Sequence, residues 1–231
     1  MLRNYTLSLI ELLLLVIFML MFFSSCGADQ TIDKIMGRDT VEANEYGTGS
    51  IRWAEGRFPI TIRANLYDFP DGSDRLEGLR GAIYSWNQAM RQEVFILKIE
   101  DLSYLDQISK SSDLTSDNVY TVTFPQSENF EWSNSQLAST HIVYGSQSLN
   151  IRQSDIIFNK SHIFRDSVNY QCRHCFDFES VALHELGHFL GFEHPPSGTV
   201  SIMKTTIEEN EVSRDLEHYD LDAIENLYPS P

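Results

Sequence analysis

Apolar and polar residues alternate along several short stretches of the chain, and a period of two predicts strands. In residues 58–65, "FPITIRAN", the apolar residues Ile60, Ile62 and Ala64 alternate with polar ones. Four further apolar or alternating runs follow, each bounded by clusters of Ser, Asn, Asp and Gly: residues 94–101, 118–125, 139–145 and 155–159. The pattern therefore predicts five strands.

Two longer stretches have the period of an amphipathic helix. Residues 74–92 place a stripe of apolar side chains on one side, and Asp74 and Glu77 are spaced like a capping box. The second stretch, residues 213–229, ends at Pro229. It directs five apolar side chains inward: Leu216, Tyr219, Ala223, Ile224 and Leu227.

A third helix is predicted between the last strand and the C-terminal helix, over residues 177–191. Asp177 can accept a hydrogen bond at its start, and Gly191 can end it because glycine adopts the left-handed backbone of a helix terminus. The predicted order is a strand, a helix, four strands, a helix, a loop and a last helix. We expect one main domain.

The first 26 residues differ from everything that follows. Arg3 precedes an apolar run from Leu12 to Phe23, which is too short to span a bilayer comfortably and is typical of a signal-peptide core. Ser24 and Ser25 then lead to Cys26, and this ending resembles a bacterial lipoprotein cleavage box. We expect a signal peptide, then a lipidated Cys26 with a flexible tether, then the folded domain: residues 1–25, 26–50 and 51–231.

A plain secretory signal and an uncleaved anchor are the alternatives for this segment, and each of the three places the domain outside the cytoplasm. We expect a lipoprotein at the periplasmic or cell surface, attached to the membrane through Cys26, and otherwise a secreted protein. The formal net charge of −16 argues against a nucleic-acid partner, because no basic stripe can replace the counterions of the phosphates. We expect a monomer.

Two more cysteines stand in "QCRHCF", residues 171–176. In an exported chain Cys172 and Cys175 are expected to form a local disulfide. A C-x-x-C pair could also bind a metal or exchange electrons with a thiol, which leaves a thiol-disulfide function as an alternative.

The stretch "HELGHFLGFEH", residues 184–194, has the spacing of a zinc site. Residues four apart lie above one another on a helix, so His184 and His188 can bind one ion. Gly191 allows a sharp turn that returns His194 to the same ion. Three neutral histidines leave one coordination position for a water, as a catalytic zinc requires, and Glu185 can act on that water as general base.

The motif H-E-x-x-H-x-x-G-x-x-H, followed by a methionine turn, resembles the signature of the metzincin peptidases. "SIMK", residues 201–204, resembles that turn, with Met203 as the apolar floor under the histidines. The short distance from His194 to Met203 is similar to that of the matrixins, the matrix-metalloproteinase group, as are the order of elements and the closing "AIENLYP". The sequence departs from the usual matrixin pattern at two places. Pro195 follows the third histidine, and no Pro-x-Tyr segment follows Met203.

The resemblance implies a zincin-like α+β catalytic domain over residues 51–231. It has a twisted, mostly parallel five-stranded sheet with an antiparallel edge strand, two long helices and a C-terminal helix. It also implies a zinc-dependent endopeptidase that cleaves a protein or peptide substrate with a zinc-bound water activated by Glu185. The substrate would lie along the edge strand, with a groove formed by four residues: Ser180, His141, Ile142 and Val143.

Two alternatives stay open, a surface-anchored binding protein of the same fold without turnover and the thiol-disulfide protein. One catalytic zinc ion is the expected cofactor. A second, structural zinc could use only His141, His162 and His174, which lack a ligand spacing, and the acidic loop 67–74 lacks the full ligand repeat of a calcium site. We therefore expect neither structural metal.

Overall fold

The computed structural model describes residues 51–107, 118–126, 132, 135–145, 148–165 and 174–229. The expected signal peptide, Cys26, the tether and Cys172 lie outside these ranges, so their assignments stay predictions. Within the ranges, no helix combines the length and the apolar character that crossing a membrane requires.

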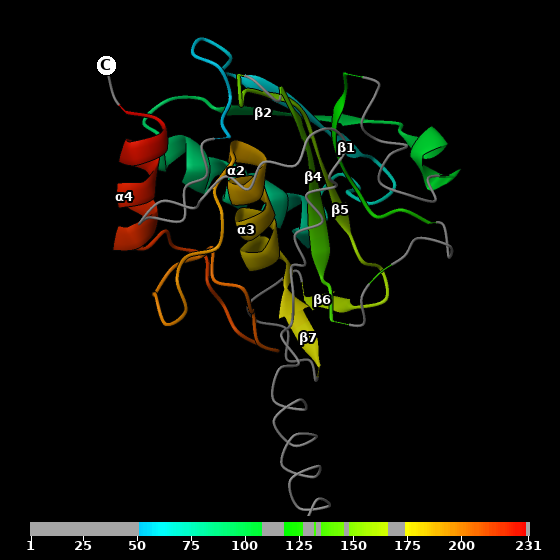
Figure 1. The fold of residues 1–231 in the computed structure, drawn as a ribbon. Helices are drawn as coiled ribbons and strands as arrows, with labels where there is room; N and C mark the ends of the chain where they lie inside the picture. Colours follow the sequence, from blue (N-terminus) through cyan, green and yellow to red (C-terminus); the bar gives the residue numbers. More distant parts are fainter. Residues whose placement is uncertain are drawn as a thin grey trace, which may run out of the picture.

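Five strands form one mixed sheet (Figure 1). In chain order they are β1 (Ile60–Asn65), β2 (Phe95–Glu100), β3 (Tyr120–Thr123), β4 (Ala138–Tyr144) and β5 (Ile151–Phe158). The spatial order is β2-β1-β3-β5-β4, and all neighbours are parallel except β4, which runs antiparallel to β5 with Thr140 opposite Ile156. The expected mostly parallel sheet with an antiparallel edge strand is confirmed.

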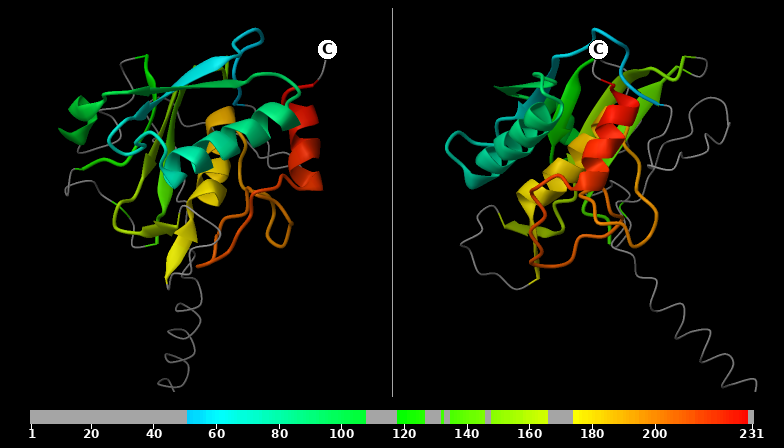
Figure 2. Two further views of the ribbon diagram at one scale, coloured as in Figure 1. Left: turned by 180° about the vertical axis from the view of Figure 1, so that it is seen from behind. Right: turned by 90° about the vertical axis from the view of Figure 1, so that its left-hand side faces the viewer.

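Two long helices, α2 (Asp74–Ala89) and α3 (Phe178–Leu190), pack against each other and against the sheet (Figures 1 and 2). The Trp86 indole of α2 donates a hydrogen bond to the Leu183 carbonyl of α3, at 2.9 Å in the buried core. A third helix, α4 (His218–Leu227), lies at the C-terminal end of the chain. The fold is the expected α+β arrangement, and its main apolar core includes buried residues of both long helices and the sheet.

The ends of the helices show how accurately neighbouring residues in the sequence predict where a helix begins and ends. Asp177 caps α3 by accepting a hydrogen bond from the Ser180 amide, and Gly191 ends it with a φ of 97°, both as expected. The expected capping box at Asp74 is wrong, because Ser73 is the N-cap of α2 and its hydroxyl accepts from the Leu76 amide. Hence Asp74 is already the first helical residue.

The C-terminal helix begins at His218, five residues later than expected from the apolar pattern. Glu217 and Asp220 form a capping box there, which fixes the start of the helix. The residues before it are bonded elsewhere: the Ser213 amide donates to the Ser180 hydroxyl at 2.8 Å, and Arg214 pairs with Asp177. These contacts with the start of α3 outweigh the local helical pattern.

Three short elements escaped the sequence analysis: the 3-10 helix η1 (Ser103–Gln107) and the strands β6 (Ile163–Arg165) and β7 (Cys175–Asp177). A strand of three residues is too short to show a period of two. β6 and β7 pair in parallel, with Arg165 opposite Asp177. This small sheet leads directly into α3 and therefore helps to place the start of the histidine helix.

Candidate metal centre

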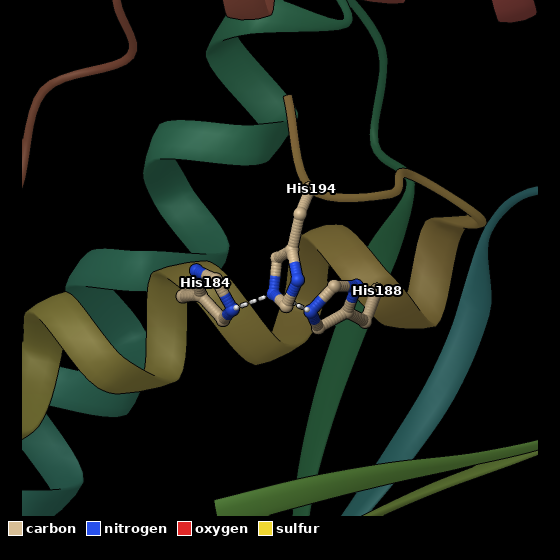
Figure 3. Close-up of side chains that lie close together, drawn as sticks. All are labelled: His184, His188 and His194. Atoms are coloured by element: carbon tan, nitrogen blue, oxygen red, sulfur yellow. Dashed lines mark hydrogen bonds between the residues drawn. The ribbon is translucent and has the colours of Figure 1, made fainter. Parts of the chain in front are cut away.

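Three histidine rings converge beside α3 (Figure 3). His184 and His188 extend from successive turns of the helix, and the left-handed backbone at Gly191 turns the chain so that His194 returns between them. The Nε2 atom of His194 lies 3.1 Å from Nε2 of His188 and 3.3 Å from Nε2 of His184. The structure thus brings together the three residues expected as metal ligands.

Backbone carbonyls hold two of the rings in a defined tautomer. Nδ1 of His184 lies 2.8 Å from the Ile202 carbonyl oxygen, and Nδ1 of His188 lies 2.7 Å from the Phe192 carbonyl oxygen. A carbonyl oxygen only accepts, so each Nδ1 must hold the proton and donate it. The Nε2 lone pairs of both rings therefore point toward His194.

The surroundings also keep the three rings neutral. Burial, and next the charge of His194, lower the pKa of His184 to about 3, and burial lowers that of His194 to about 4. Burial and the two other histidines hold the pKa of His188 well below its ordinary value. At neutral pH the site therefore presents uncharged imidazoles, the form that binds a metal.

These rings fit a zinc ion better than they fit one another. The single Nε2 proton that a neutral His194 can hold cannot satisfy the lone pairs of both neighbours, so a cation would complete the site. Zinc bonds histidine nitrogen at about 2.0 to 2.1 Å, and tetrahedral angles then separate two ligand nitrogens by about 3.3 to 3.4 Å. The observed separations of 3.1 and 3.3 Å are close to that value.

Glu185 lies next to this centre with 1% of its surface exposed. Burial raises the pKa of its carboxyl to about 7, and a hydrogen bond from the Thr140 hydroxyl acts in the opposite direction. Thr140 Oγ1 donates to Glu185 Oε2 at 2.6 Å. The edge strand β4 thereby holds the carboxyl of the expected base, a contact that the sequence analysis missed because 45 residues separate the partners.

The methionine turn lies under α3 as expected. A Cβ atom built on Gly187 would stand 2.3 Å from Met203 Sδ, so the helix and the turn are in direct contact. Asp220 of α4 fixes the turn, since its carboxylate accepts from the Ile202 amide at 3.0 Å and from the Ser201 hydroxyl. Because the Ile202 carbonyl accepts from His184, Asp220 supports the orientation of that ring, a role that no spacing in the sequence indicates.

The start of α3 is held by a buried ionic network around Asp177, which is fully buried. Arg214 contacts both carboxylate oxygens at 2.7 and 2.8 Å, and Arg165 contacts one at 3.3 Å. Burial raises the pKa of Asp177, but the hydrogen bonds and charge of Arg214 and the bonds from Ser180 outweigh it, so the net pKa is lowered.

Ser180 lies inside this network, although we expected it in the substrate groove. Its hydroxyl donates to Asp177 at 2.7 Å and accepts from the Ser213 amide, and only 1% of its surface is exposed. The next residue, Val181, lines the hollow beside the metal centre in its place. The Ser180 hydroxyl therefore joins the cap of α3 to the segment before α4.

The other expected groove residues lie on β4, the edge strand. Side chains alternate between the faces of a strand, and Thr140 points toward α3, so Ile142 shares its face and packs against the main core. His141 and Val143 point to the opposite face, and His141 is buried. The backbone of the strand, rather than the side chain of His141, is therefore what a substrate could reach.

Cys175, in β7, is disulfide-bonded. Its expected partner Cys172 lies outside the described residues, so the pairing of these two cysteines stays a prediction.

Within the described residues, one group of side chains could hold a metal ion, and it consists of His184, His188 and His194. His174 instead pairs with Glu209 at 2.8 Å, and His162 packs its ring edge-on against Phe176.

A three-histidine centre with a buried glutamate beside it is typical of catalytic metal sites, since structural zinc sites use four protein ligands. The comparison with known families agrees: the family model described as Matrixin matches residues 97–229, more than half of the chain. The protein belongs to the matrixin family, a family of zinc-dependent metallopeptidases. A comparison with curated proteins found no match.

Proposed function

We propose that this protein is a zinc-dependent endopeptidase with Glu185 as its general base. The observation that supports this most directly is the convergence of three neutral Nε2 atoms at zinc-binding distances, with a buried carboxyl on the adjacent residue. A scaffold that only bound metal would have no need of an acidic group buried there, because burial of a carboxyl is unfavourable.

His184, His188 and His194 would hold the zinc through Nε2. When bound, zinc polarises a carbonyl oxygen and makes water a stronger acid. Glu185 then accepts the proton of the attacking water and passes it to the nitrogen of the leaving amine. The Thr140 hydroxyl orients the carboxyl for both transfers, since it is bonded to Oε2.

The substrate would pair its backbone with the outer side of β4. This strand is hydrogen-bonded to β5 on one side, and the described part of the chain places no further strand of the sheet on the other. Addition of an extended peptide to such an edge uses backbone hydrogen bonds for affinity and leaves side-chain preference to neighbouring pockets.

The test is purification with measured metal content, followed by exposure to a diverse peptide library. We expect about one zinc per chain, cleavage of some peptides at internal bonds, loss of cleavage with a chelator and recovery on addition of zinc. Protein that holds stoichiometric zinc and cleaves no member of a broad library would contradict the proposal.

From the sequence alone we also propose that the enzyme is exported and held at a membrane by lipid on Cys26. Replacement of Cys26 by serine should block lipid attachment and release the domain from the membrane fraction. Unchanged membrane partition together with an unchanged mass of the mature protein would exclude lipidation of Cys26.

A further inference from the structure

A small hollow lies directly beside the metal centre. Three apolar side chains, Leu137, Val181 and Ile207, form much of its lining, and His184 and Glu185 border it. The remaining lining residues, Lys204 and Thr205, follow the methionine turn, where no Pro-x-Tyr segment stands.

The hollow is positioned to receive the side chain that follows the scissile bond, an assignment that rests on the proposed function. Glu185 must reach the nitrogen of the leaving amine in order to protonate it, so the residue that contains this nitrogen lies beside Glu185. The hollow bordered by Glu185 is then the space nearest to the side chain of that residue.

The hollow is narrow. Its total space is about 240 Å³ with the solvent at its mouth included, but the protein atoms leave room for about one water molecule. A methyl group needs a similar volume to a water molecule, whereas a leucine or phenylalanine side chain needs several times more. A long side chain can therefore enter only if a wall moves.

The outer wall is the segment of residues 204–214, and a side-chain ion pair closes it on itself. Lys204 pairs with Glu211, and both side chains are about one-third exposed. The other oxygen of Glu211 accepts from the Glu208 amide at 2.9 Å. The pair thus joins Lys204, which lines the hollow, to a residue seven positions further along the wall.

The far end of the wall is held against the start of α3. Arg214 binds Asp177 and Glu179, and Arg165 donates to the Asn210 carbonyl at 3.1 Å. At the near end, Met203 is held because its amide donates to the Ser201 hydroxyl at 2.8 Å. With both ends held and Lys204 joined to Glu211, the wall resists outward movement.

We infer that the Lys204–Glu211 pair determines the specificity of the peptidase, by limiting the residue after the scissile bond to a small uncharged side chain such as alanine or serine. The apolar part of the lining, formed by Leu137, Val181 and Ile207, disfavours a charged side chain, and the closed wall excludes a long one. Removal of either partner should let leucine-sized side chains enter.

The experiment compares two peptides that share a sequence cleaved by the wild type and differ only after the scissile bond, alanine in one and leucine in the other. For the full-length wild-type enzyme we expect kcat/KM to favour alanine by ~10-fold or more, since a few methylenes in a closed pocket have effects of this size. In Lys204→Ala and Glu211→Ala, we expect the ratio to fall by ~10-fold.

The matched control is Arg63→Ala, which breaks the Arg63–Glu100 pair between β1 and β2, away from the edge strand β4. It should leave the alanine-to-leucine ratio at the wild-type value. Melting temperature and zinc content of each variant show whether it is folded, and the wild-type ratio tests the size of the pocket even if one variant does not fold.

A wild-type preference for leucine would overturn the inference and leave the peptidase proposal intact. A preference for alanine that both wall variants retain would overturn the role of the ion pair. Absence of cleavage of any peptide by zinc-loaded enzyme would instead contradict the proposed function itself, so the two failures are distinguishable.

Discussion

The two segments that meet at the metal centre are held in place in different ways. In α3 every residue except Glu179 is buried, and helical hydrogen bonds together with apolar packing fix each position. In the wall, residues 204–214, Ile207 alone is buried and no helix or strand forms. Its position depends on a few side-chain contacts, above all those of Arg214 and the Lys204–Glu211 pair.

The difference indicates which properties of the enzyme can change independently. A substitution in α3 disturbs the core and the metal ligands together, because the same helix supplies both. A substitution in the wall changes the shape of the pocket without touching a ligand. Stability and metal binding should therefore respond strongly to α3, and substrate preference to the wall.

The largest effect is expected for His188→Ala. Two histidines remain, and a site with two protein ligands binds zinc far more weakly than one with three. Metal and peptidase activity should be lost together, as measured by metal analysis and peptide cleavage on the same sample. A variant that keeps stoichiometric zinc would show that His188 is not a ligand.

Next in size is Asp177→Asn, at the junction of the two segments. The change leaves Arg165 without its buried counter-charge and Arg214 paired with Glu179, and removal of one partner of a buried ion pair costs about 3 kcal/mol or more. The free energy of unfolding, measured with urea on metal-free protein, should fall by about this amount. A change below about 1 kcal/mol would mean that the network does not fasten the wall to α3.

The same pair of proteins gives a pH test. The pKa of Asp177 in the folded state is lowered below its ordinary value of 3.8, so its stabilisation is present above that value and is lost as the pH falls through the lower folded pKa. The difference in stability between wild type and Asp177→Asn should be constant near neutral pH and shrink below about pH 4. A difference that persists fully at lower pH would contradict this origin.

A smaller effect is expected for Gly187→Ala in the middle of α3. The added Cβ would stand 2.3 Å from Met203 Sδ and 3.0 Å from Trp86, so the methionine turn must shift. Overpacking of this kind costs about 1 to 3 kcal/mol, although alanine favours the helix itself by up to about 1 kcal/mol. Thermal unfolding should show a net loss of stability, and a gain would mean that Met203 moves aside freely.

The sequence was informative where structure depends on neighbours in the chain. The metal helix, its cap at Asp177, its end at Gly191 and the three histidines follow from spacings of a few residues. The alternation in residues 58–65 likewise predicted β1. These features need no knowledge of the tertiary fold.

Contacts between distant residues could not be predicted in this way. Thr140 reaches Glu185 across 45 residues, and Ser201 and Ile202 meet Asp220 across 19 and 18. Ser180 shows the opposite error, since its expected place in the groove ignored the bonds to Asp177 and Ser213. The late start of α4 has the same cause, because Arg214 finds a charged partner outside its own segment.

The most direct test of the central claim is Glu185→Gln, with zinc content and peptide hydrolysis measured on one preparation. Glutamine keeps the size of the side chain but cannot accept the proton, while the three histidines remain. We predict about one zinc per chain, as in the wild type, and a loss of hydrolysis of at least ~10²- to 10⁴-fold. Zinc-loaded Glu185→Gln that cleaves peptides as fast as the wild type would contradict the proposed mechanism.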